Sequence, residues 1–562
     1  MWYWLGMYLR TITSRPRKDG SVVRYLQLAH NEWDPERRCS VAKVVHSFGR
    51  EDQVDRDALA RLVRSISRVL DPAEQLAAQA EGELAFVGSA PLGGAWALDG
   101  LWRRLAVDAA LAGLLEGRRL DARAERLVFA MVANRALAAG SKRACAEWVG
   151  SDVVIPGLGE VGDPQPLYRA MDWLLEVEDT LAQAVYWATA DLLNLEVDLL
   201  FFDTTSTYFE SEQADPPPDG ETVGFRAFGK SKDHRPDLPQ VVIGMAVTRG
   251  GIPVRVWCWP GNTNDSALIR QVKDDLRAWK LARVVWVADR GFTSAANRRY
   301  LQRAGSHYII GEKLRGDSEE AKAALARQGR YHTVAGNLQV KEVLIDDGVM
   351  RDRFVICRNP DQAERDRIVR ERLVTQLEEA IAGSDDLAAT DRAALGTRLP
   401  AGLRRFLRTT KAGLLRVDRT AIRAEAHLDG KFLLRTSDPT LSAEDVALGY
   451  KQLLEVERGW RDMKTTLDLR PVYHHLEDRI RAHVLLCWLA LLLIRVAETE
   501  VGDTWRNIRR ELQRLHLGTF AGPAGRVLQR TEITTAQAGI LRALHVDQPP
   551  KFFDVDPHAS PA

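Results

Sequence analysis

The sequence predicts a multidomain α/β protein, and three observations support this prediction. The chain has 562 residues, and a single hydrophobic core rarely grows beyond about 250–300 residues. Residues 85–195 carry apolar side chains at three- and four-residue intervals, which is typical of amphipathic helices. Residues 196–313 alternate strand-like apolar runs with helical segments, as expected for strands and helices packed in layers. We therefore expect an α/β core preceded by smaller domains.

Residues 1–84 predict a small α+β module. Three strand-like runs are separated by turn residues, and a helix follows with Asp55 as its N-cap. The first 50 residues contain nine Lys or Arg and four Asp or Glu. This basic hairpin either contacts a nucleic-acid backbone or belongs to an ordinary small module. In the helical domain, residues 85–195, Lys142 and Arg143 begin a predicted helix. This helix either contacts a phosphate backbone or belongs to an ordinary helical bundle.

Residues 196–313 predict the first part of the core. The run VDLLFFDTTSTYF reads as a strand buried on both faces, with Asp203 at the end of its apolar part. A strand hairpin turns at Gly250-Gly251, and a helix is expected from Asp265 to about Lys280. The next strand delivers Asp289, and a further helix and strand follow. The order is strand, hairpin of strands, helix, strand, helix, strand.

The rest of the chain divides into three predicted segments. Residues 314–443 are too many for a loop and predict an inserted α+β domain, mostly β, with a charged helical section from Gln362 to about Gly383. Residues 444–500 complete the core, and residues 501–562 form a basic C-terminal region. The apolar run from Val484 to Ile494 is shorter than the roughly 20 residues that span a bilayer. It predicts a buried helix and no membrane contact.

Charge and cysteine usage narrow the class of protein. The net charge of +1 leaves room for local basic patches that bind nucleic acid. The five cysteines have no paired spacing, which argues against a disulfide framework or a zinc module and for the reducing cytosol. The start of the sequence lacks the basic region and cleavage pattern of a signal peptide. We expect a cytoplasmic protein.

The stretch from Tyr450 to Lys464 carries the strongest signal in the chain. Read as one helix at about 100° per residue, it places Tyr450, Glu457 and Lys464 on one face, with Arg461 beside them. A solvated ion pair is the alternative to a functional face. Because Asp203 and Asp289 also end apolar runs, three carboxylates from two strands and a helix are expected to converge. Such a site suits divalent metal and phosphate chemistry.

The succession of elements resembles the ribonuclease-H-like core of DDE nucleic-acid enzymes, whose third carboxylate lies on a later helix. The whole chain further resembles insertion-sequence transposases of the IS-four superfamily, in the branch with a long inserted domain before the catalytic Glu. Their third motif is Y-x2-R-x3-E-x6-K, and Tyr450, Glu457 and Lys464 fit its spacing, whereas Leu453 stands in place of the Arg. Four further stretches carry the resemblance: DTTSTYF, GKSKDHRPDLPQ, PGNTNDS and ADRGFTSAAN.

The resemblance implies a Mg²⁺-dependent DNA transposase, with Mn²⁺ as a substitute ion. It implies cut-and-paste transposition by a homodimer on DNA, which binds the terminal inverted repeats and then a target. Asp203 is expected to bridge two ions, with Asp289 and Glu457 completing the two shells. A ribonuclease-H-like structure-specific nuclease and a catalytically silent transposase-derived DNA-binding protein are the alternatives. The enzyme is expected on the nucleoid.

Further DNA contacts follow from the same resemblance. Arg461 and Lys464 are expected to bind the phosphate beside the cut, and the Tyr450 hydroxyl a second phosphate, with a solvated charged face as the alternative. The loop cations are expected to touch the DNA backbone or to form an ordinary surface charge run; they are Lys230, Lys232, His234 and Arg235. His234 is either a proton shuttle or a structural residue. Phe432 either stacks on a flipped base or packs in a core strand.

Overall fold

The computed structural model describes residues 7–14, 22–34, 37, 39–55, 57–59, 61–63, 65, 84–193, 199–218, 223–277, 279, 281, 284–316, 318–346, 351–522 and 525–556. The chain forms two compact units. The first comprises Met1–Ser89, Leu517–Thr531 and Pro550–Ala562, and the second comprises Ala90–His516 and Glu532–Pro549.

The first unit contains two sheets. The predicted N-terminal strands form an antiparallel sheet in the order β1 (Met7–Thr13), β2 (Arg24–Asp34), β3 (Cys39–Arg50). The expected N-cap is present, because Asp55 Oδ1 accepts a hydrogen bond from the backbone N–H of Ala58 at 2.9 Å. The rest of the helix expected after it lies largely outside the described residues.

The second sheet of this unit joins two distant parts of the sequence. Its order is β18 (Phe552–Asp556), β17 (Gly525–Arg530), β16 (His516–Gly522), β4 (Ala85–Pro91). The helical prediction for residues 85–91 was therefore wrong. Phe86 packs edge-on against Phe520, with ring centroids 5.6 Å apart, and a partner 430 residues away leaves no trace in local periodicity.

The second unit begins with a helical layer that confirms the predicted helices of residues 85–195. The helices are α3 (Gly93–Arg104), α4 (Val107–Leu115), α5 (Ala124–Leu137), α6 (Lys142–Ser151), α7 (Gln165–Glu176) and α8 (Glu178–Leu192). Helical periodicity runs without interruption through α3 and α4 and through α7 and α8, but each pair of helices is broken. Ala106 adopts a left-handed conformation with φ 52° between α3 and α4, and α7 ends at Val177, where α8 begins.

A nine-stranded mixed sheet forms the centre of the second unit. Its order is β10 (His332–Ala335), β11 (Leu338–Asp346), β12 (Arg351–Arg358), β15 (Lys431–Thr436), β9 (His307–Glu312), β8 (Val285–Ala288), β5 (Leu199–Tyr208), β6 (Gln240–Thr248), β7 (Pro253–Pro260). Strands β5, β6 and β7 are antiparallel, whereas β8 and β9 run parallel to β5. This arrangement confirms the predicted element order and is consistent with a ribonuclease-H-like core.

Strand β5 is longer than its apolar part. It continues through Thr204 to Tyr208 because this stretch is rich in Thr and aromatic residues, which favour strands. Asp203 therefore lies in the middle of β5, and not at its end as we expected. Side chains alternate between the two faces of the sheet, and Phe202 meets Trp257 on one face. Asp203 points to the opposite face.

The segment 314–443 is not a mostly β domain, and that prediction was wrong. Its strands β10, β11, β12 and β15 extend the core sheet beyond β9. The remainder is largely helical and consists of α11 (Glu319–Ala326), α12 (Pro360–Ile381), α13 (Ala389–Arg398), α14 (Ala401–Arg404) and α15 (Arg419–Ala426), with a small hairpin of β13 (Leu407–Thr409) and β14 (Leu415–Val417). The helices pack on a separate small apolar cluster around Leu377 and Phe406.

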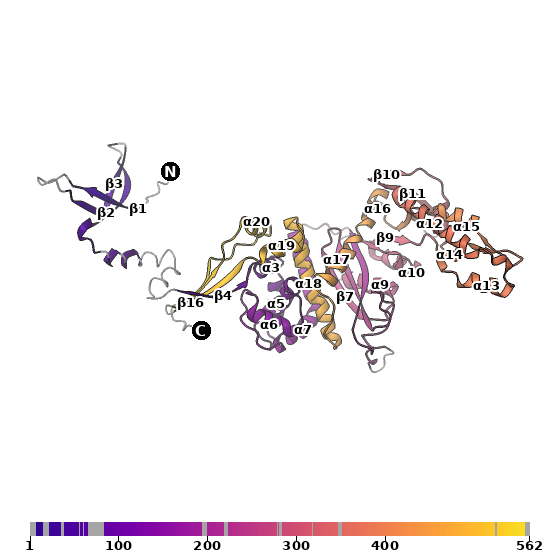
Figure 1. Ribbon diagram of the computed structural model, residues 1–562, viewed down its shortest axis with the longest axis horizontal. Helices are drawn as coiled ribbons and strands as arrows, with labels where there is room; N and C mark the ends of the chain where they lie inside the picture. The colour runs from indigo at the N-terminus through magenta and orange to yellow at the C-terminus, as the bar shows by residue number, and fades with distance from the viewer. Residues whose placement is uncertain are drawn as a thin grey trace. The chain divides into compact units, whose positions relative to one another are not determined.

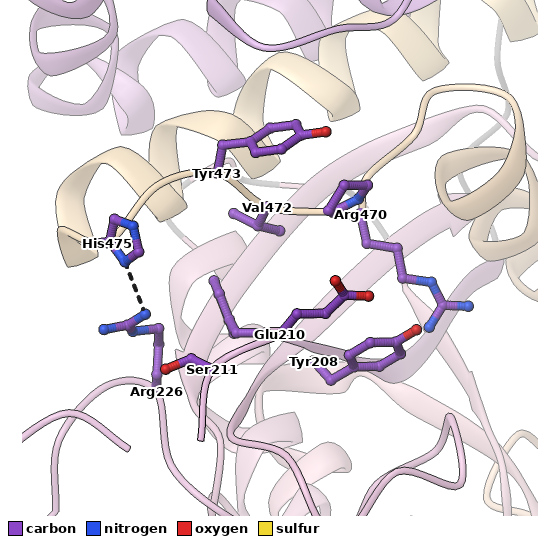
Figure 2. A pocket seen from close by; sticks show the side chains of 10 residues that line it. Tyr208, Glu210, Ser211, Arg226, Arg470, Val472, Tyr473 and His475 are labelled. Atoms are coloured by element: carbon purple, nitrogen blue, oxygen red, sulfur yellow. Dashed lines mark hydrogen bonds between the residues drawn. The ribbon is translucent and has the colours of Figure 1, made fainter. Parts of the chain in front are cut away.

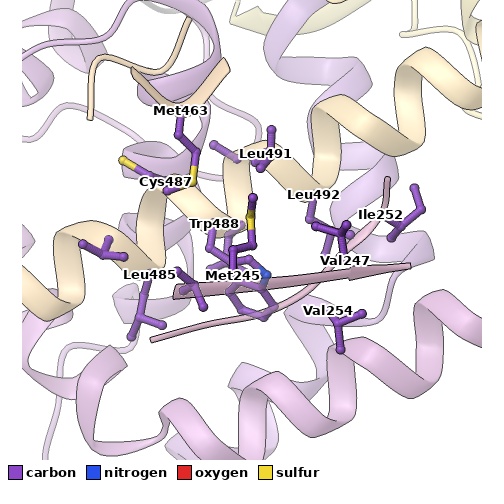
Figure 3. Packing of buried hydrophobic residues seen from close by; sticks show 14 of the residues in the cluster. Met245, Val247, Ile252, Val254, Met463, Leu485, Cys487, Trp488, Leu491 and Leu492 are labelled. Atoms are coloured by element: carbon purple, nitrogen blue, oxygen red, sulfur yellow. The ribbon is translucent and has the colours of Figure 1, made fainter. Parts of the chain in front are cut away.

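Helix α18 (Glu477–Val501) lies between the helical layer and the sheet, where it contacts α5, α7 and β7 (Figure 1). Figure 3 shows Leu485, Trp488 and Leu492 of α18 packed against Met245 and Val247 of β6. Among the described helices only α18 is long and apolar enough to cross a membrane. Because 94% of its most apolar window is buried within the protein, it is packed as a core helix.

The remaining helices surround the sheet. They are α9 (Asp265–Arg277), α10 (Ala295–Leu301), α16 (Ala443–Lys451), α17 (Leu454–Thr465), α19 (Trp505–Leu512) and α20 (Thr535–Ala543). Helix α17 lies on the face of β5 and β6 toward which Asp203 points. The approach is close at Gly459, where a Cβ atom would lie 2.6 Å from Met245 Cε. A glycine here lets the Glu457 helix approach the sheet.

Candidate active site

The sheet register brings Asp203 and Asp289 together. Phe202 of β5 pairs with Ala288 of β8 in parallel register, so the next residues of the two strands, Asp203 and Asp289, are lateral neighbours. Neighbouring strands lie about 4.8 Å apart. Two aspartates that are 86 positions apart in sequence are therefore adjacent in space.

Glu457 lines the same cavity as the two aspartates. The cavity has a volume of about 350 Å³, and its walls are Asp203, Asp289, Phe432, Tyr450, Lys451, Leu453, Leu454 and Glu457. Glu457 is exposed, Asp289 is half-buried, and the Asp203 side chain is 24% exposed. Glu455, the nearest alternative carboxylate on α17, lies instead against Gly251 in the β6–β7 turn. The predicted trio therefore faces one cavity, with its third member provided by Glu457.

The charge balance around Asp203 favours a cation. Burial raises the pKa of the Asp203 carboxyl, and the negative charges of Asp289 and Asp265 add to this rise. The Lys232 ammonium and a backbone hydrogen bond from Thr204 oppose the rise; Lys232 Nζ lies 3.7 Å from Asp203 Oδ1 and 3.2 Å from Asp265 Oδ2. The ammonium also donates to the Thr204 backbone oxygen. A positive charge placed between the aspartates would stabilise their ionised forms.

The donor atoms of the trio fit a hard divalent cation. Mg²⁺ prefers carboxylate oxygens, together with water and phosphate oxygens, and three carboxylates border the cavity. Within the described part of the chain, no three His, Cys, Asp or Glu side chains are grouped closely enough to hold a metal ion. The donor type therefore fits, and Glu457 is the exposed member of the trio.

Tyr450 holds Asp289 through a hydrogen bond. Its hydroxyl donates to Asp289 Oδ1 at 3.2 Å, and burial followed by the charge of Asp289 raises the pKa of Tyr450. Gly311 makes this contact sterically feasible, because a Cβ atom there would lie 2.4 Å from the Tyr450 hydroxyl oxygen. Gly311 follows Ile310, the register partner of Ala288. The lack of a side chain on β9 thus admits the tyrosine that orients Asp289.

Gly311→Ala is expected to slow DNA cleavage about tenfold with little change in DNA affinity. The added methyl group displaces the Tyr450 hydroxyl, and a hydrogen bond to a charged group contributes about 1.5 kcal/mol. Cleavage rates under saturating DNA measure this effect. Tyr450→Phe is the matched control, because it removes the same hydrogen bond without the clash. If Gly311→Ala slows cleavage while Tyr450→Phe cleaves at the wild-type rate, the hydrogen bond between Tyr450 and Asp289 has no role in cleavage.

Tyr450 and Glu457 do not share one helix, contrary to our prediction. Tyr450 belongs to α16 and Glu457 to α17, and the chain between them makes i→i−3 hydrogen bonds, including Leu453 N–H to the Tyr450 carbonyl at 3.0 Å. This tighter turn rotates the two helices relative to each other. Although seven residues separate each of these side chains from the next, Tyr450 therefore contacts Asp289, whereas Lys464 contacts Asp233 and Thr205.

Lys464 forms a mostly buried ion pair in the structure. Its Nζ donates to Asp233 Oδ1 and to Thr205 Oγ1, both at 2.8 Å, and its side chain is 13% exposed. Arg470 NH1 lies 2.8 Å from the other oxygen of Asp233. Burial lowers the pKa of Lys464, and Asp233 opposes this shift. The contacts fix α17 to β5 and to the polar loop, so the predicted phosphate contact of Lys464 requires a rearrangement of this pair.

Arg470 extends this network to a neighbouring cavity of about 480 Å³. Its guanidinium lies 5.0 Å from the centroid of the Tyr208 ring, and Figure 2 shows both side chains on the cavity wall. On the opposite wall, Arg226 lies 3.2 Å from His475. No carboxylate of the trio lines this cavity. The network links the loop after β5 to the segment that follows α17.

Lys464→Ala is expected to lower the melting temperature clearly. It is expected to change the slope of log K against log salt by less than the contribution of one phosphate contact. The reason is the loss of two buried hydrogen bonds, each worth about 1–3 kcal/mol when a charged group is involved. Thermal melts and plots of log K against log salt measure the two effects. Lys230→Ala is the control, since Lys230 is an exposed lysine of the loop that carries Asp233. A slope reduced by about 0.9 with an unchanged melting temperature would show that Lys464 binds phosphate directly.

The other predicted cations have different surroundings. Arg461 is exposed and lines a separate groove, away from the carboxylates. Lys230 and His234 are exposed, and no hydrogen bond or ion pair of their side chains is found among the described residues; His234 has a left-handed φ of 57°. Arg235 pairs with Asp237 at 2.8 Å. Of the predicted loop residues, the structure places only Lys232 in contact with the trio.

Phe432 separates the carboxylate cavity from a second cavity of about 440 Å³ and lines both. It is half-buried, and its ring stacks near Tyr450 with centroids 6.2 Å apart. The second cavity is bordered by Arg290, Lys313 and Lys431, and no ion pair of these three is found among the described residues. A basic wall therefore begins where the acidic cavity ends.

Sequence reasoning missed four residues of the site: Asp233, Asp265, Gly311 and Arg470. The first two lie within the quoted stretches GKSKDHRPDLPQ and PGNTNDS, so a signal was present without an assigned role. Gly311 and Arg470 lie outside every quoted stretch. Their contacts depend on strand register and on the segment after α17, which sequence spacing does not reveal.

One comparison with known proteins identifies the family of the chain. The family model described as "Transposase DDE domain" matches residues 204–493. No curated protein matches the chain. A cryo-EM structure of the piggyBac transposase synaptic complex with hairpin DNA is similar with a TM-score of 0.35 and 10% identity, over 76% of this chain and 82% of that chain. Because the family model covers just over half of the chain and includes Asp289 and Glu457, the protein belongs to the DDE transposase domain family.

Proposed function

We propose that this protein is a cut-and-paste DNA transposase of the IS-four superfamily that acts on the terminal inverted repeats of its own element. The observation that carries the proposal is the lateral pairing of Asp203 with Asp289, with Glu457 on the same cavity. Family membership implies phosphoryl transfer on DNA. The spacing of Tyr450, Glu457 and Lys464 supports the superfamily, although Leu453 departs from the motif.

In this proposal Asp203, Asp289 and Glu457 hold divalent ions, Mg²⁺ or Mn²⁺. When bound, these ions activate the attacking oxygen and stabilise the leaving oxygen of the scissile phosphate. Tyr450 keeps the Asp289 carboxylate oriented through its hydrogen bond. Leu453 and Leu454 form the apolar part of the cavity lining. Glu457 moves inward from its exposed position to complete the site.

The proposed DNA path begins at the basic wall beside Phe432. The basic cavity is bordered by Arg290, Lys313 and Lys431. It shares three lining residues, Asp289, Phe432 and Tyr450, with the carboxylate cavity. Cations without protein partners are available to neutralise backbone phosphates, and such contacts position DNA without reading its sequence. A strand whose scissile phosphate lies at the carboxylates can thus continue along this wall.

The overall reaction requires two ends of one element to be held together. We propose a homodimer on DNA, with one chain acting at each end, and a cytoplasmic location on the nucleoid. The freed 3′-OH of each end then attacks target DNA. The basic N-terminal module and the helical domain are assigned to DNA binding outside the active site, in line with the excess of Lys and Arg in the first 50 residues.

The test uses purified full-length protein and labelled duplexes that carry the imperfect inverted repeats flanking the reading frame. With Mg²⁺, the proposal expects nicked, double-cut and strand-joined products from these ends and none from scrambled ends. Cleavage without joining under all conditions would instead identify a structure-specific nuclease. Specific binding without any cleavage would identify a DNA-binding protein that has lost catalysis.

A further inference from the structure

A further groove borders α17, and it shares no lining residue with the carboxylate cavity. It has a volume of about 490 Å³, and it is lined by Ala139, Arg458, Arg461, Asp462, Thr465, Thr466, Asp468, Ile494, Glu498, Thr504, Trp505, Arg506 and Arg509. Most of these residues come from α17, the last turns of α18 and the first turns of α19, and the others follow α5 and α17 or precede α19. We call it the α19 groove. Nothing in the proposed chemistry uses it.

Two of the acidic residues of the α19 groove are already neutralised within the protein. Asp462 lies 2.5 Å from the buried guanidinium of Arg495. Glu498 pairs with Arg495 at 2.6 Å and with Arg458 at 2.9 Å, and it also accepts the backbone N–H of Trp505 at 2.8 Å. These carboxylates are therefore occupied by arginines behind the surface. Asp468, exposed at the edge, is the remaining negative charge.

Three arginines in the same groove have no such partner. In the described part of the chain, the side chains of Arg461, Arg506 and Arg509 make no hydrogen bond or ion pair, and Arg461 and Arg506 are exposed. Thr466 and Thr504 add hydroxyl groups to the walls, whereas the Thr465 hydroxyl donates to the Arg461 backbone carbonyl at 2.8 Å. Guanidinium and hydroxyl donors around a concave surface suit phosphate oxygens, which arginine can bind in a bidentate manner.

The position of the groove relates it to the carboxylates. Arg461 follows Glu457 by four residues, which places it on nearly the same face of α17 and about 6 Å further along the axis. The basic wall of Arg290, Lys313 and Lys431 lies beyond Phe432. The Phe432 wall thus adjoins the carboxylate cavity, and α17 contributes residues both to that cavity and to the α19 groove.

We propose that the α19 groove binds backbone phosphates of the DNA on the opposite side of the scissile phosphate from the Phe432 wall. The proposal rests on the proposed transposase function and adds to it the surface that holds DNA flanking the element. Arg506 and Arg509 are its principal contacts, together with Arg461. The binding is electrostatic and independent of base sequence, because the donors reach phosphate oxygens only.

The test compares the double variant Arg506→Ala/Arg509→Ala with the control Arg510→Ala/Arg514→Ala. The control removes the same charge from the same part of the chain, but Arg510 and Arg514 pair with Glu511 and do not line the groove. Full-length proteins bind two duplexes without divalent metal: an element end with about 20 base pairs of flanking DNA, and the same end truncated at the cleavage position. The slope of log K against log salt is measured for each.

On flanked DNA, the groove variant is expected to lose about 1.8 from the slope, since each phosphate contact contributes about 0.9. The truncated duplex and the control variant are expected to show no change. Equal slopes for wild type and groove variant on both duplexes overturn the proposal, and so does an equal loss in the control. A loss on both duplexes places the groove on the element side and overturns the assignment to flanking DNA.

The result is separable from a failure of the proposed function. Because the slopes are measured without metal, they are readable even for a protein that binds the ends and never cuts them. Melting curves of both variants provide the check on folding, and equal melting temperatures are expected because the substituted side chains lack buried partners.

Discussion

Asp203→Asn, Asp289→Asn and Glu457→Gln are each expected to reduce nicking of end DNA by roughly 10³-fold or more. The three carboxylates line one cavity, and charge stabilisation by a divalent ion at such a site contributes several kcal/mol, where each 1.4 kcal/mol is tenfold in rate. The amide isosteres keep the shape of the side chains and remove the negative charge. Single-turnover nicking in Mg²⁺ measures the loss.

The matched control is Glu455→Gln, which removes a carboxylate from the same helix. Glu455 lies against the β6–β7 turn and pairs loosely with Arg458 at 3.8 Å, so wild-type nicking is expected. Binding to end DNA is expected to persist in all four variants, because affinity depends on basic contacts elsewhere. A Glu457→Gln protein that still cuts, or a Glu455→Gln protein that does not, would transfer the third role to Glu455.

The direction of the Asp203 pKa shift adds a stability signature. Burial raises the pKa of this carboxyl, so the folded protein favours the protonated form. The contribution of the group to stability is fully present below its unfolded pKa and is lost as pH rises through the raised folded value. At neutral pH without metal, Asp203→Asn is therefore expected to melt at the same or a higher temperature than wild type. A clear decrease would mean that Asp203 has a structural partner beyond Lys232.

The acidic trio was predictable because its members lie beside strong local patterns. The apolar run before Asp203 and the run before Asp289 identify their strands, and parallel pairing then makes the two aspartates neighbours. Glu457 follows from its spacing to Tyr450 and Lys464 together with the family resemblance. The order of the core elements along the chain was predicted for the same reason, since β5 to β9 are apolar strands bounded by clear turns.

The parts that were not predicted depend on contacts between distant segments. Strand β4 is a strand only because β16 pairs with it, and the strands of the insert join the core sheet through β15 and β9. The turn between α16 and α17 contains no Gly or Pro, so helical periodicity continues through Leu453 although the hydrogen bonds do not. The partners of Lys464 likewise come from β5 and a loop some 230 residues earlier.

Phe432 is expected to act in the step that follows the first nick. It lies at the boundary between the carboxylate cavity and the basic cavity, and it is half-buried with its ring near Tyr450. A base flipped out of the bent strand can stack on an aromatic ring, which is worth roughly 1–3 kcal/mol. Phe432→Ala is therefore expected to slow second-strand cleavage or hairpin closure about 5- to 150-fold. Nicking, which needs no flipped base, is expected to remain nearly intact.

Phe432→Trp provides the matched variant, because a larger ring restores stacking. It is expected to recover the second-strand step to the wild-type rate or above. Time courses of nicked and double-cut end DNA, combined with a thermal melt of each variant, distinguish stacking from a packing role. If Phe432 only packs in β15, a different pattern is expected. A Phe→Ala substitution in a core costs about 3–5 kcal/mol of stability, so nicking, double cleavage and the melting temperature would decline together. That parallel decline, without rescue by Trp, would assign Phe432 to the core.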